Sequence, residues 1–227
     1  MNEGSVRAFW DRFFELTIYY IGPALGETLY MTMLSAALAM ILGFMIAIVL
    51  IMSGPHGLRP NQKVYSVFDF AVNLLRSFPF IILLILVLPL SKLLFNIRIG
   101  TNAVIMPLTI GAAPFVARIM EGSLLEVDRE VVEAARSFGA GNMQIIFRVL
   151  FKEALPSIIL NIAVLVITLL GYSAMAGTVG GGGLGNLAIV YGYQRFQTDV
   201  MIYSVIVLVI IVQCVQSLGN YLYHRLR

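Results

Sequence analysis

Five apolar stretches, each about 20 residues long, alternate with polar segments along this sequence. They run roughly over residues 28–52, 72–91, 103–120, 157–176 and 200–218. A helix needs about 20 apolar residues to cross the hydrocarbon core of a bilayer, and soluble domains rarely contain several such stretches. The composition agrees, because 59% of the residues are hydrophobic and 12% are charged, against about 25% in soluble domains. The sequence therefore predicts an all-α polytopic membrane protein with five transmembrane helices.

The segment before the first stretch is apolar, but it is short for a membrane span. Residues 9–21 contain Trp10 and two tyrosines together with three charged side chains, and Gly22-Pro23 follows them. Aromatic and charged residues in this mixture favour an interfacial helix, which we expect Gly22-Pro23 to end. We thus predict an N-terminal interfacial segment over 1–24, a membrane domain over 25–222 and a cytoplasmic tail over 223–227. A cleaved signal peptide is not expected, because no uninterrupted apolar core with a cleavage site follows the basic residues.

Lysine and arginine are unevenly distributed between the alternate loops. One side has Arg59, Lys63, Arg118, Arg129, Arg136, Arg148, Lys152, Arg225 and Arg227, whereas the other has Arg7, Arg12, Lys92, Arg98 and Arg195. Cationic loops are retained in the cytoplasm, so the N-terminus is predicted outside and the C-terminus inside. A net charge of +3, distributed in this way, gives no basic stripe, so nucleic-acid binding is not indicated.

Small residues and prolines predict how some of these helices pack. Ala39, Gly43 and Ala47 recur at four-residue spacing in the first stretch, which is typical of close helix packing. Pro107 and Pro114 lie in the third stretch, and the second also contains prolines. Each proline leaves a backbone carbonyl without its helical donor, which is tolerated inside the protein or beside a wet cavity. Kinks that only help packing are an equally good interpretation.

The polar segment over residues 118–154 is charged, yet it has helical periodicity. It contains six of the 12 acidic residues. Ser123 and Glu126 have the spacing of a capping box and predict the start of a helix, which Gly139 would end, and a second helix is predicted from about Asn142. One face of the first helix carries Val127, Val131, Ala134, Ala135 and Phe138. An apolar ridge on a cytoplasmic loop favours a protein-docking surface over a solvated linker.

Glu133-Ala134-Ala135, followed by Gly139 and then Val149, resembles the EAA loop of permease subunits of bacterial ATP-binding-cassette importers. The family pattern ends in Leu-Pro, and this chain departs from it with Phe151-Lys152, while Leu155-Pro156 comes four residues later. Three further segments, residues 76–84, 107–118 and 171–185, are similar to the methionine-uptake branch of that family. The resemblance covers about residues 25–220.

The resemblance implies a homodimer in the bacterial inner membrane that moves methionine or a related amino acid by alternating access. Each copy would dock onto a partner ATPase, and an external substrate-binding protein would deliver the cargo. The ATPase-coupling element would consist of Glu133, Ala134, Ala135 and Gly139, together with Phe138 on the same helix. No G-x-x-x-x-G-K-[ST] sequence occurs, so the chain is expected to hold no cofactor and to catalyse no reaction itself. ATP and Mg²⁺ are expected on the partner ATPase.

Several polar or adaptable residues are candidates for the translocation path. Tyr172, Ser173 and Met175, near the outer end of the fourth stretch, are predicted to form an external gate, and Asn161 is a further candidate. Arg76 is the one strong charge inside a predicted span, where anchoring at the interface is favoured over gating.

A nucleotide site and a metal site are both disfavoured by the sequence. Residues 180–185 satisfy G-x-G-x-x-G, yet they follow a membrane helix and lack an acidic residue at the expected distance, so a flexible outer loop is predicted. His56 and His224 have no second ligand beside them, which disfavours a metal site.

Other functions remain possible from the residues alone. The same importer class could carry another small solute. An ion-coupled secondary transporter should have an inverted repeat and ionisable residues near the membrane midplane, and a membrane enzyme should have paired acids or a nucleophile within its spans. The five apolar stretches show no paired acids, no nucleophile and no ionisable residues near the midplane, so they fit these two classes less well.

Overall fold

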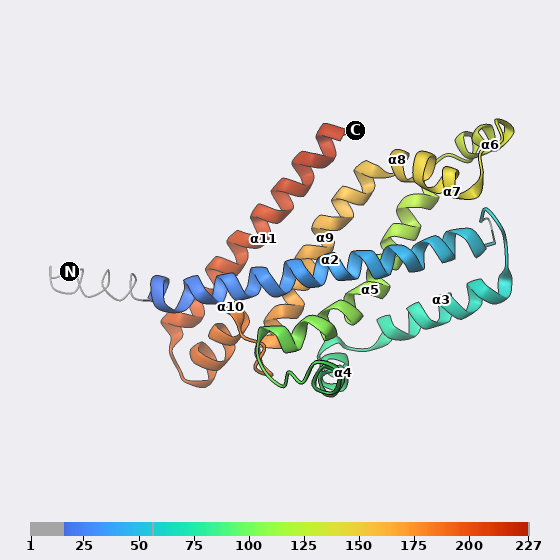
Figure 1. Cartoon of the computed structure of the whole chain (residues 1–227). Helices are drawn as coiled ribbons and strands as arrows, with labels where there is room; N and C mark the ends of the chain where they lie inside the picture. Colours follow the sequence, from blue (N-terminus) through green and yellow to red (C-terminus); the bar gives the residue numbers. More distant parts are fainter. Residues whose placement is uncertain (1–15, 56, 227) are drawn as a thin grey trace. The chain divides into compact units, whose positions relative to one another are not determined.

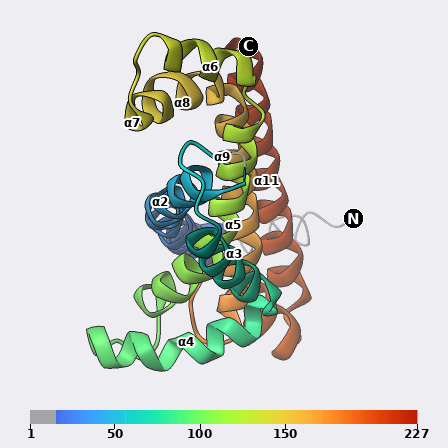
Figure 2. The same cartoon turned by 90° about the vertical axis from the view of Figure 1, so that its right-hand side faces the viewer.

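Every regular element is helical in residues 16–55 and 57–226, the part of the chain that the computed structural model describes (Figures 1 and 2). In chain order the elements are the π-helical η1 (Leu16–Ile21), α2 (Gly22–Ser53), α3 (Gln62–Ser77), α4 (Phe80–Phe95), α5 (Thr101–Leu125), α6 (Arg129–Ser137), α7 (Asn142–Gln144), the π-helical η2 (Ile145–Leu150), α8 (Phe151–Glu153), α9 (Leu155–Gly177), α10 (Gly183–Asn186), the π-helical η3 (Leu187–Gln194) and α11 (Thr198–Leu226). Four helices in this part of the chain are long and apolar enough to cross a membrane, and a fifth span results if α3 and α4 count as one bent pair. The predicted all-α polytopic fold is confirmed.

The first long helix begins earlier than predicted. The π-helical η1 continues directly into α2, so Leu16–Ser53 form one helix of 38 residues. The prediction that Gly22-Pro23 ends a helix is therefore wrong. Pro23 lies inside this continuous helix and contributes no N–H donor, and the hydrogen bonding directly before it, in η1, is π-helical. The predicted start of the interfacial helix lies outside the described residues.

The second apolar stretch is not one straight helix, which corrects the predicted span over 72–91. It is divided between α3 and α4, and the break falls at Phe78-Pro79. Phe78 has extended backbone angles (φ −75°, ψ 130°). Proline disfavours a helical conformation in the residue before it and contributes no N–H donor, so Pro79 explains the break. Pro89, by contrast, lies within α4.

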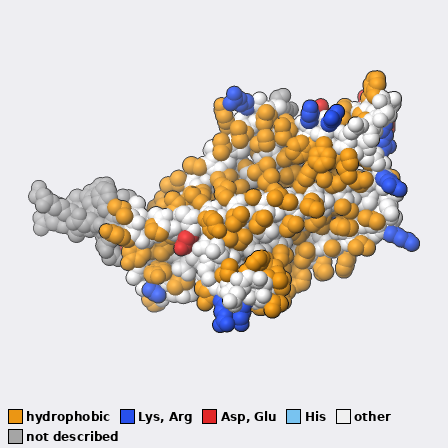
Figure 3. All heavy atoms as spheres, viewed as in Figure 1, with side chains coloured by type: hydrophobic (Ala, Val, Ile, Leu, Met, Phe, Trp, Pro, Cys, Tyr) orange, Lys and Arg blue, Asp and Glu red, His pale blue; other side chains and the backbone are white. Residues whose placement is uncertain are grey.

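Burial differs strongly between the candidate spans. In α5, 61% of the most apolar window is buried, whereas the corresponding share in α11 is 11%. Pro107 and Pro114 both lie in α5, which runs unbroken past them. This agrees with the expectation that a proline-bearing membrane helix packs inside the protein. On the face drawn in Figure 3, hydrophobic side chains predominate and Lys and Arg side chains are few. Such a surface is suited to lipid.

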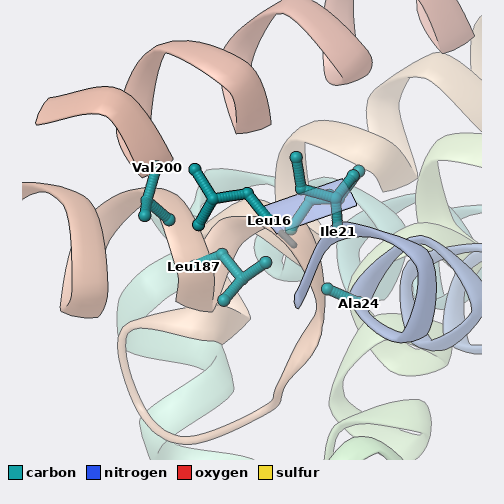
Figure 4. Close-up of a cluster of buried hydrophobic side chains, with 6 residues drawn as sticks. Leu16, Ile21, Ala24, Leu187 and Val200 are labelled. Atoms are coloured by element: carbon teal, nitrogen blue, oxygen red, sulfur yellow. The ribbon is translucent and has the colours of Figure 1, made fainter. Parts of the chain in front are cut away.

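The chain divides into two compact units. The first contains the segment ending at Ser35 together with Phe80–Leu108 and Thr168–Gln213. Its hydrophobic core joins Leu16, Ile21 and Ala24 to Leu187 and Val200, as Figure 4 shows. This core brings the start of the first helix against η3 and the start of α11.

The second unit contains Ala36–Pro79, Thr109–Ile167 and the segment from Cys214 onward. Its core includes Leu50 of α2, Val72 of α3 and Ala117 of α5. The predicted small-residue stripe is confirmed, because Ala39, Gly43 and Ala47 are all buried. At Gly43 a Cβ atom would lie 2.5 Å from the Cβ of Val116, so only glycine permits this approach of α2 to α5.

Candidate functional site

The predicted docking loop forms a group of short helices in the second unit. Figures 1 and 2 show α6, α7 and α8 close together in both views. The second helical segment begins at Asn142, as predicted. The Gln144 side chain accepts a hydrogen bond of 2.9 Å from the Gly141 N–H, which fixes its first turn.

The first docking helix, α6, begins later than the capping-box spacing predicted. The preceding helix α5 continues to Leu125, so Ser123 lies inside that helix and is buried. The N-cap of α6 is Asp128, whose side chain accepts a hydrogen bond from the Glu130 N–H at 2.9 Å. The predicted Ser123–Glu126 capping box is wrong, because α5 continues past Ser123. Leu124 is 1% exposed, and burying this leucine favours continuation of α5.

The C-terminal end of α6 confirms the prediction for Gly139. Its φ angle is +80°, in the left-handed region that favours glycine. The Gly139 N–H donates to the Arg136 carbonyl at 2.9 Å, and the Ala140 N–H donates to the Ala135 carbonyl at 3.1 Å. These two bonds define a Schellman motif, which ends a helix firmly. The direction in which the chain leaves α6 is therefore fixed by Gly139.

The predicted coupling residues lie on an uncovered surface. Glu133 and Ala134 are exposed, Ala135 is half-buried, and Phe138 is 92% exposed. None of the residues of α6 is buried. Exposed apolar side chains continue along the loop at Val131, Met143 and Phe147. A short amphipathic helix whose apolar side chains face outward is typical of a surface that a partner protein covers.

The three predicted gate residues all lie in the first unit, near the end of α9. The Tyr172 ring stacks on Phe80, with centroids 4.0 Å apart and an angle of 1° between the rings. Ser173 is buried and donates a hydrogen bond to the Leu170 carbonyl of its own helix. Met175 is 45% exposed. The structure thus gives Tyr172 an aromatic partner that the sequence did not indicate.

The other two path candidates, Asn161 and Arg76, lie in the second unit. The Asn161 amide donates to the Ser123 hydroxyl at 2.8 Å and so joins α9 to α5. Arg76 is exposed in the last turn of α3, where a cation interacts favourably with the helix dipole. Their participation in a path stays a prediction.

The glycine-rich segment at 180–185 is packed rather than loose, which corrects the predicted flexible loop. The Gly183 N–H donates to the Glu27 carboxylate at 2.6 Å, and the Leu184 N–H donates to the Thr28 hydroxyl at 2.9 Å. Gly183 has a φ angle of +75°, and a Cβ there would lie 2.6 Å from the Thr28 hydroxyl oxygen. Glycine is therefore needed for both backbone conformation and space. Sequence reasoning missed Glu27 and Thr28, which stand out only as polar residues near the start of an apolar helix.

A polar cluster around Arg118 was also missed. In the second unit, the Arg118 guanidinium pairs with Asp69 of α3, donates to Asn73 at 3.1 Å, and pairs with Glu121 at 2.7 Å. The spacing of Arg118 and Glu121 could have indicated their pairing within a helix. Asp69 is 49 residues away from Arg118, so only the fold brings these two together.

Known proteins share this sequence over nearly its whole length. Residues 51–227 match the family described as the binding-protein-dependent transport system inner membrane component. The chain is 44% identical over 214 residues to a probable D-methionine transport system permease protein, MetI, of Vibrio cholerae, covering 94% of this chain and 95% of the relative. It is 45% identical over 171 residues to the methionine import system permease protein MetP of Bacillus subtilis, covering 75% and 77%.

Solved structures show the same fold. A chain of the inward-facing MetNI methionine ABC transporter superposes with a TM-score of 0.91 at 38% identity, covering 94% of this chain and 99% of that chain. An amino acid ABC transporter crystallised with histidines gives a TM-score of 0.74 at 20% identity over 99% of each chain, which shows a shared fold alone.

Proposed function

Because this chain belongs to the family of inner membrane components of binding-protein-dependent transport systems, we propose that it is the transmembrane subunit of an importer for methionine or a closely related amino acid. The observation that carries the substrate class is the 44% identity, over 94% of this chain, to a probable D-methionine permease. The superposition on a chain of a methionine transporter supports the same proposal.

A partner ATPase covers the C-terminal half of α6 and the segment after it. Its contact surface includes Glu133, Ala134, Ala135, Phe138 and Gly139, and the exposed ring of Phe138 is its most prominent apolar group. ATP and Mg²⁺ bind to that partner, since this chain contains no Walker A sequence. Closure of two ATPases displaces the docking helices, and the attached membrane helices convert this displacement into alternating access.

Two permease copies and an external binding protein complete the importer. The large exposed surface of α11, where 11% of the most apolar window is buried, is available to a second copy or to lipid. The N-terminus lies outside and the C-terminus in the cytoplasm, as the Lys and Arg distribution predicts. Cargo then enters past Tyr172 and Met175 and leaves toward the ATPases.

Uptake in proteoliposomes tests this function. The chain, its ATPase and its binding protein are reconstituted together, with ATP and Mg²⁺ on the ATPase side, and uptake of radiolabelled L- and D-methionine is compared with uptake of leucine. We expect methionine uptake only when all three proteins and ATP are present. Uptake by the permease alone, driven by an ion gradient, would contradict the importer function. ATP-dependent uptake of leucine without methionine would contradict the substrate class only.

A further inference from the structure

The docking helix α6 does not pack tightly against the turn between α2 and α3. A cavity of about 230 Å³ lies beside it. This cavity is bordered by Val132, Glu133 and Arg136 of α6, and by Gly57 and Leu58 of the turn between α2 and α3. Because no residue of α6 is buried, few apolar contacts hold α6 to that turn. Displacement of α6 by a partner therefore requires another connection if it is to reach α2 and α3.

Arg136 provides such a connection. Its guanidinium Nη2 donates a hydrogen bond of 2.9 Å to the carbonyl oxygen of Leu58. The two residues are 78 positions apart in the sequence and both border the cavity. Arg136 is neighbour to Ala135 and donates from the helix whose exposed residues are proposed to contact the ATPase. One side chain therefore joins the docking helix to the turn between α2 and α3.

Residues 57–61 of the turn, which receive this hydrogen bond, are themselves firmly held. The Arg59 N–H donates to the Met52 carbonyl, and the Asn61 N–H donates to the Ser53 carbonyl, each at 2.9 Å. The Asn61 side chain then accepts from the Val64 N–H at 3.3 Å and caps α3. A force on the Leu58 carbonyl thus acts on both the end of α2 and the start of α3.

From α3 the connection continues to α5. Asp69 and Asn73 of α3 both accept hydrogen bonds from Arg118 of α5. Within the second unit, polar contacts therefore link α6 through Arg136 to the turn, through the turn to α3, and through α3 to α5. The chain also joins α5 to α6 directly, by residues 126–128. The links form a closed ring.

We propose that Arg136 is a positioning residue for the coupling step. It makes α6 move together with the turn between α2 and α3, so that ATPase-driven displacement reaches these two helices as well as α5 and α9, which adjoin the docking loop. The inference rests on the proposed importer function. Arg136 needs no contact with the ATPase for this role, because it acts through the Leu58 carbonyl.

Three variants test the role of Arg136 in the reconstituted importer. Arg136→Met keeps an unbranched apolar stem and removes the donors of the side chain, whereas Arg136→Lys keeps a charged donor. Arg129→Met is the matched control, because Arg129 lies in the same helix and borders the same cavity. We expect Arg136→Met to lower the number of methionine molecules transported per ATP hydrolysed by roughly three- to tenfold, the effect of losing one hydrogen bond. Arg136→Lys should retain most of the parental ratio. Arg129→Met should keep both the parental ratio and the parental ATPase co-purification.

A distance measurement supplies a readout that a general loss of stability would not produce. Spin labels are attached to Lys63→Cys on α3 and Glu130→Cys on α6, both at exposed positions, in a Cys214→Ser background. With Arg136 present, we expect the same distance between the labels in nucleotide-free and ATP-bound complexes. With Arg136→Met, the distance should change between the two states.

Several outcomes would overturn the proposal. A parental transport ratio in Arg136→Met would show that the bond to Leu58 carries no coupling. Loss of ATPase co-purification in Arg136→Met would make Arg136 a docking contact instead. An equal fall of the transport ratio in Arg129→Met would show that the positive charge of α6, and not the bond to Leu58, determines the ratio. Uptake by the parental importer without ATP would remove the proposed function, and the inference with it.

Discussion

The carboxylate of Glu27 accepts a hydrogen bond of 2.6 Å from the backbone N–H of Gly183, although 156 residues separate the two in the sequence. The contact joins the first membrane helix to the glycine-rich segment that follows α9. Thr28 makes a second bond to the next residue, Leu184, which is fully buried. Both bonds lie in the same unit as the gate candidates Tyr172 and Met175.

Removal of the Glu27 acceptor should loosen the glycine-rich segment. Glu27→Ala deletes a hydrogen bond to a charged acceptor, which contributes about 1–2 kcal/mol at a partly exposed site. We expect faster amide hydrogen exchange in peptides covering residues 180–190, measured by mass spectrometry. Glu27→Gln keeps an oxygen acceptor and should have the smaller effect. Equal exchange in Glu27→Ala and the parental protein would show that this bond does not hold the segment.

Gly183→Ala should be clearly destabilising. A Cβ at this position would be 2.6 Å from both the Thr28 hydroxyl oxygen and the Met31 methyl carbon, in a residue whose φ angle is +75°. The conformational strain alone costs about 1–2 kcal/mol. Gly171→Ala is the matched control, because Gly171 is helical and has nothing within 4 Å of an added Cβ. That change should be neutral or stabilising by about 0.5–1 kcal/mol. Thermal unfolding in detergent compares the two, and a similar Tm for both variants would contradict the prediction.

Gly139→Val should weaken docking without affecting the membrane helices. The φ angle of +80° at this position strains a residue with a side chain by about 1–2 kcal/mol, although the surrounding space is open. The Schellman motif at the end of α6 should therefore be lost. Gly139→Asn is the control, because asparagine tolerates the left-handed region. We expect lower ATPase co-purification for Val than for Asn at equal expression, and normal co-purification of the Val variant would show that this turn is not needed.

The stacked pair of Phe80 and Tyr172 should stabilise the first unit around the predicted gate. Tyr172→Ala removes a half-buried ring and its stacking partner contact, at a cost of about 2–4 kcal/mol. Tyr172→Phe keeps the ring and should unfold at nearly the parental temperature. A role of the hydroxyl in the path would instead appear as reduced uptake by Tyr172→Phe in a stable protein.

Thiol labelling tests the predicted orientation in the membrane. Gly182 is unsuitable for a reporter cysteine, because a Cβ there would lie 2.5 Å from a Glu27 carboxylate oxygen. Phe196 is 90% exposed and Glu130 is also exposed. In a Cys214→Ser background, Phe196→Cys should react with an impermeant reagent added outside intact cells. Glu130→Cys should react only after permeabilisation, and the reverse pattern would place the docking loop on the wrong side for an ATPase.

The sequence by itself determined the parts of this protein that depend on local composition and periodicity. Long apolar runs predicted the helices α2, α5, α9 and α11, because a bilayer selects segments by length and hydrophobicity. The position of Gly139 predicted the end of α6, because a left-handed residue is a local requirement of the helix terminus. The EAA resemblance indicated the family for the same reason, since its residues are close together in the chain.

The tertiary structure decided the contacts between distant residues and the element boundaries that depend on them. Ser123 has the spacing of a helix cap, yet the burial of Leu124 extends α5 past it. The glycine-rich segment has the composition of a loose loop, yet Glu27 and Thr28 hold it. Arg136 and Leu58, like Arg118 and Asp69, meet only after the helices have packed. Such pairs leave no periodic pattern in one sequence, because their partners are fixed by the packing of whole helices and not by neighbours along the chain.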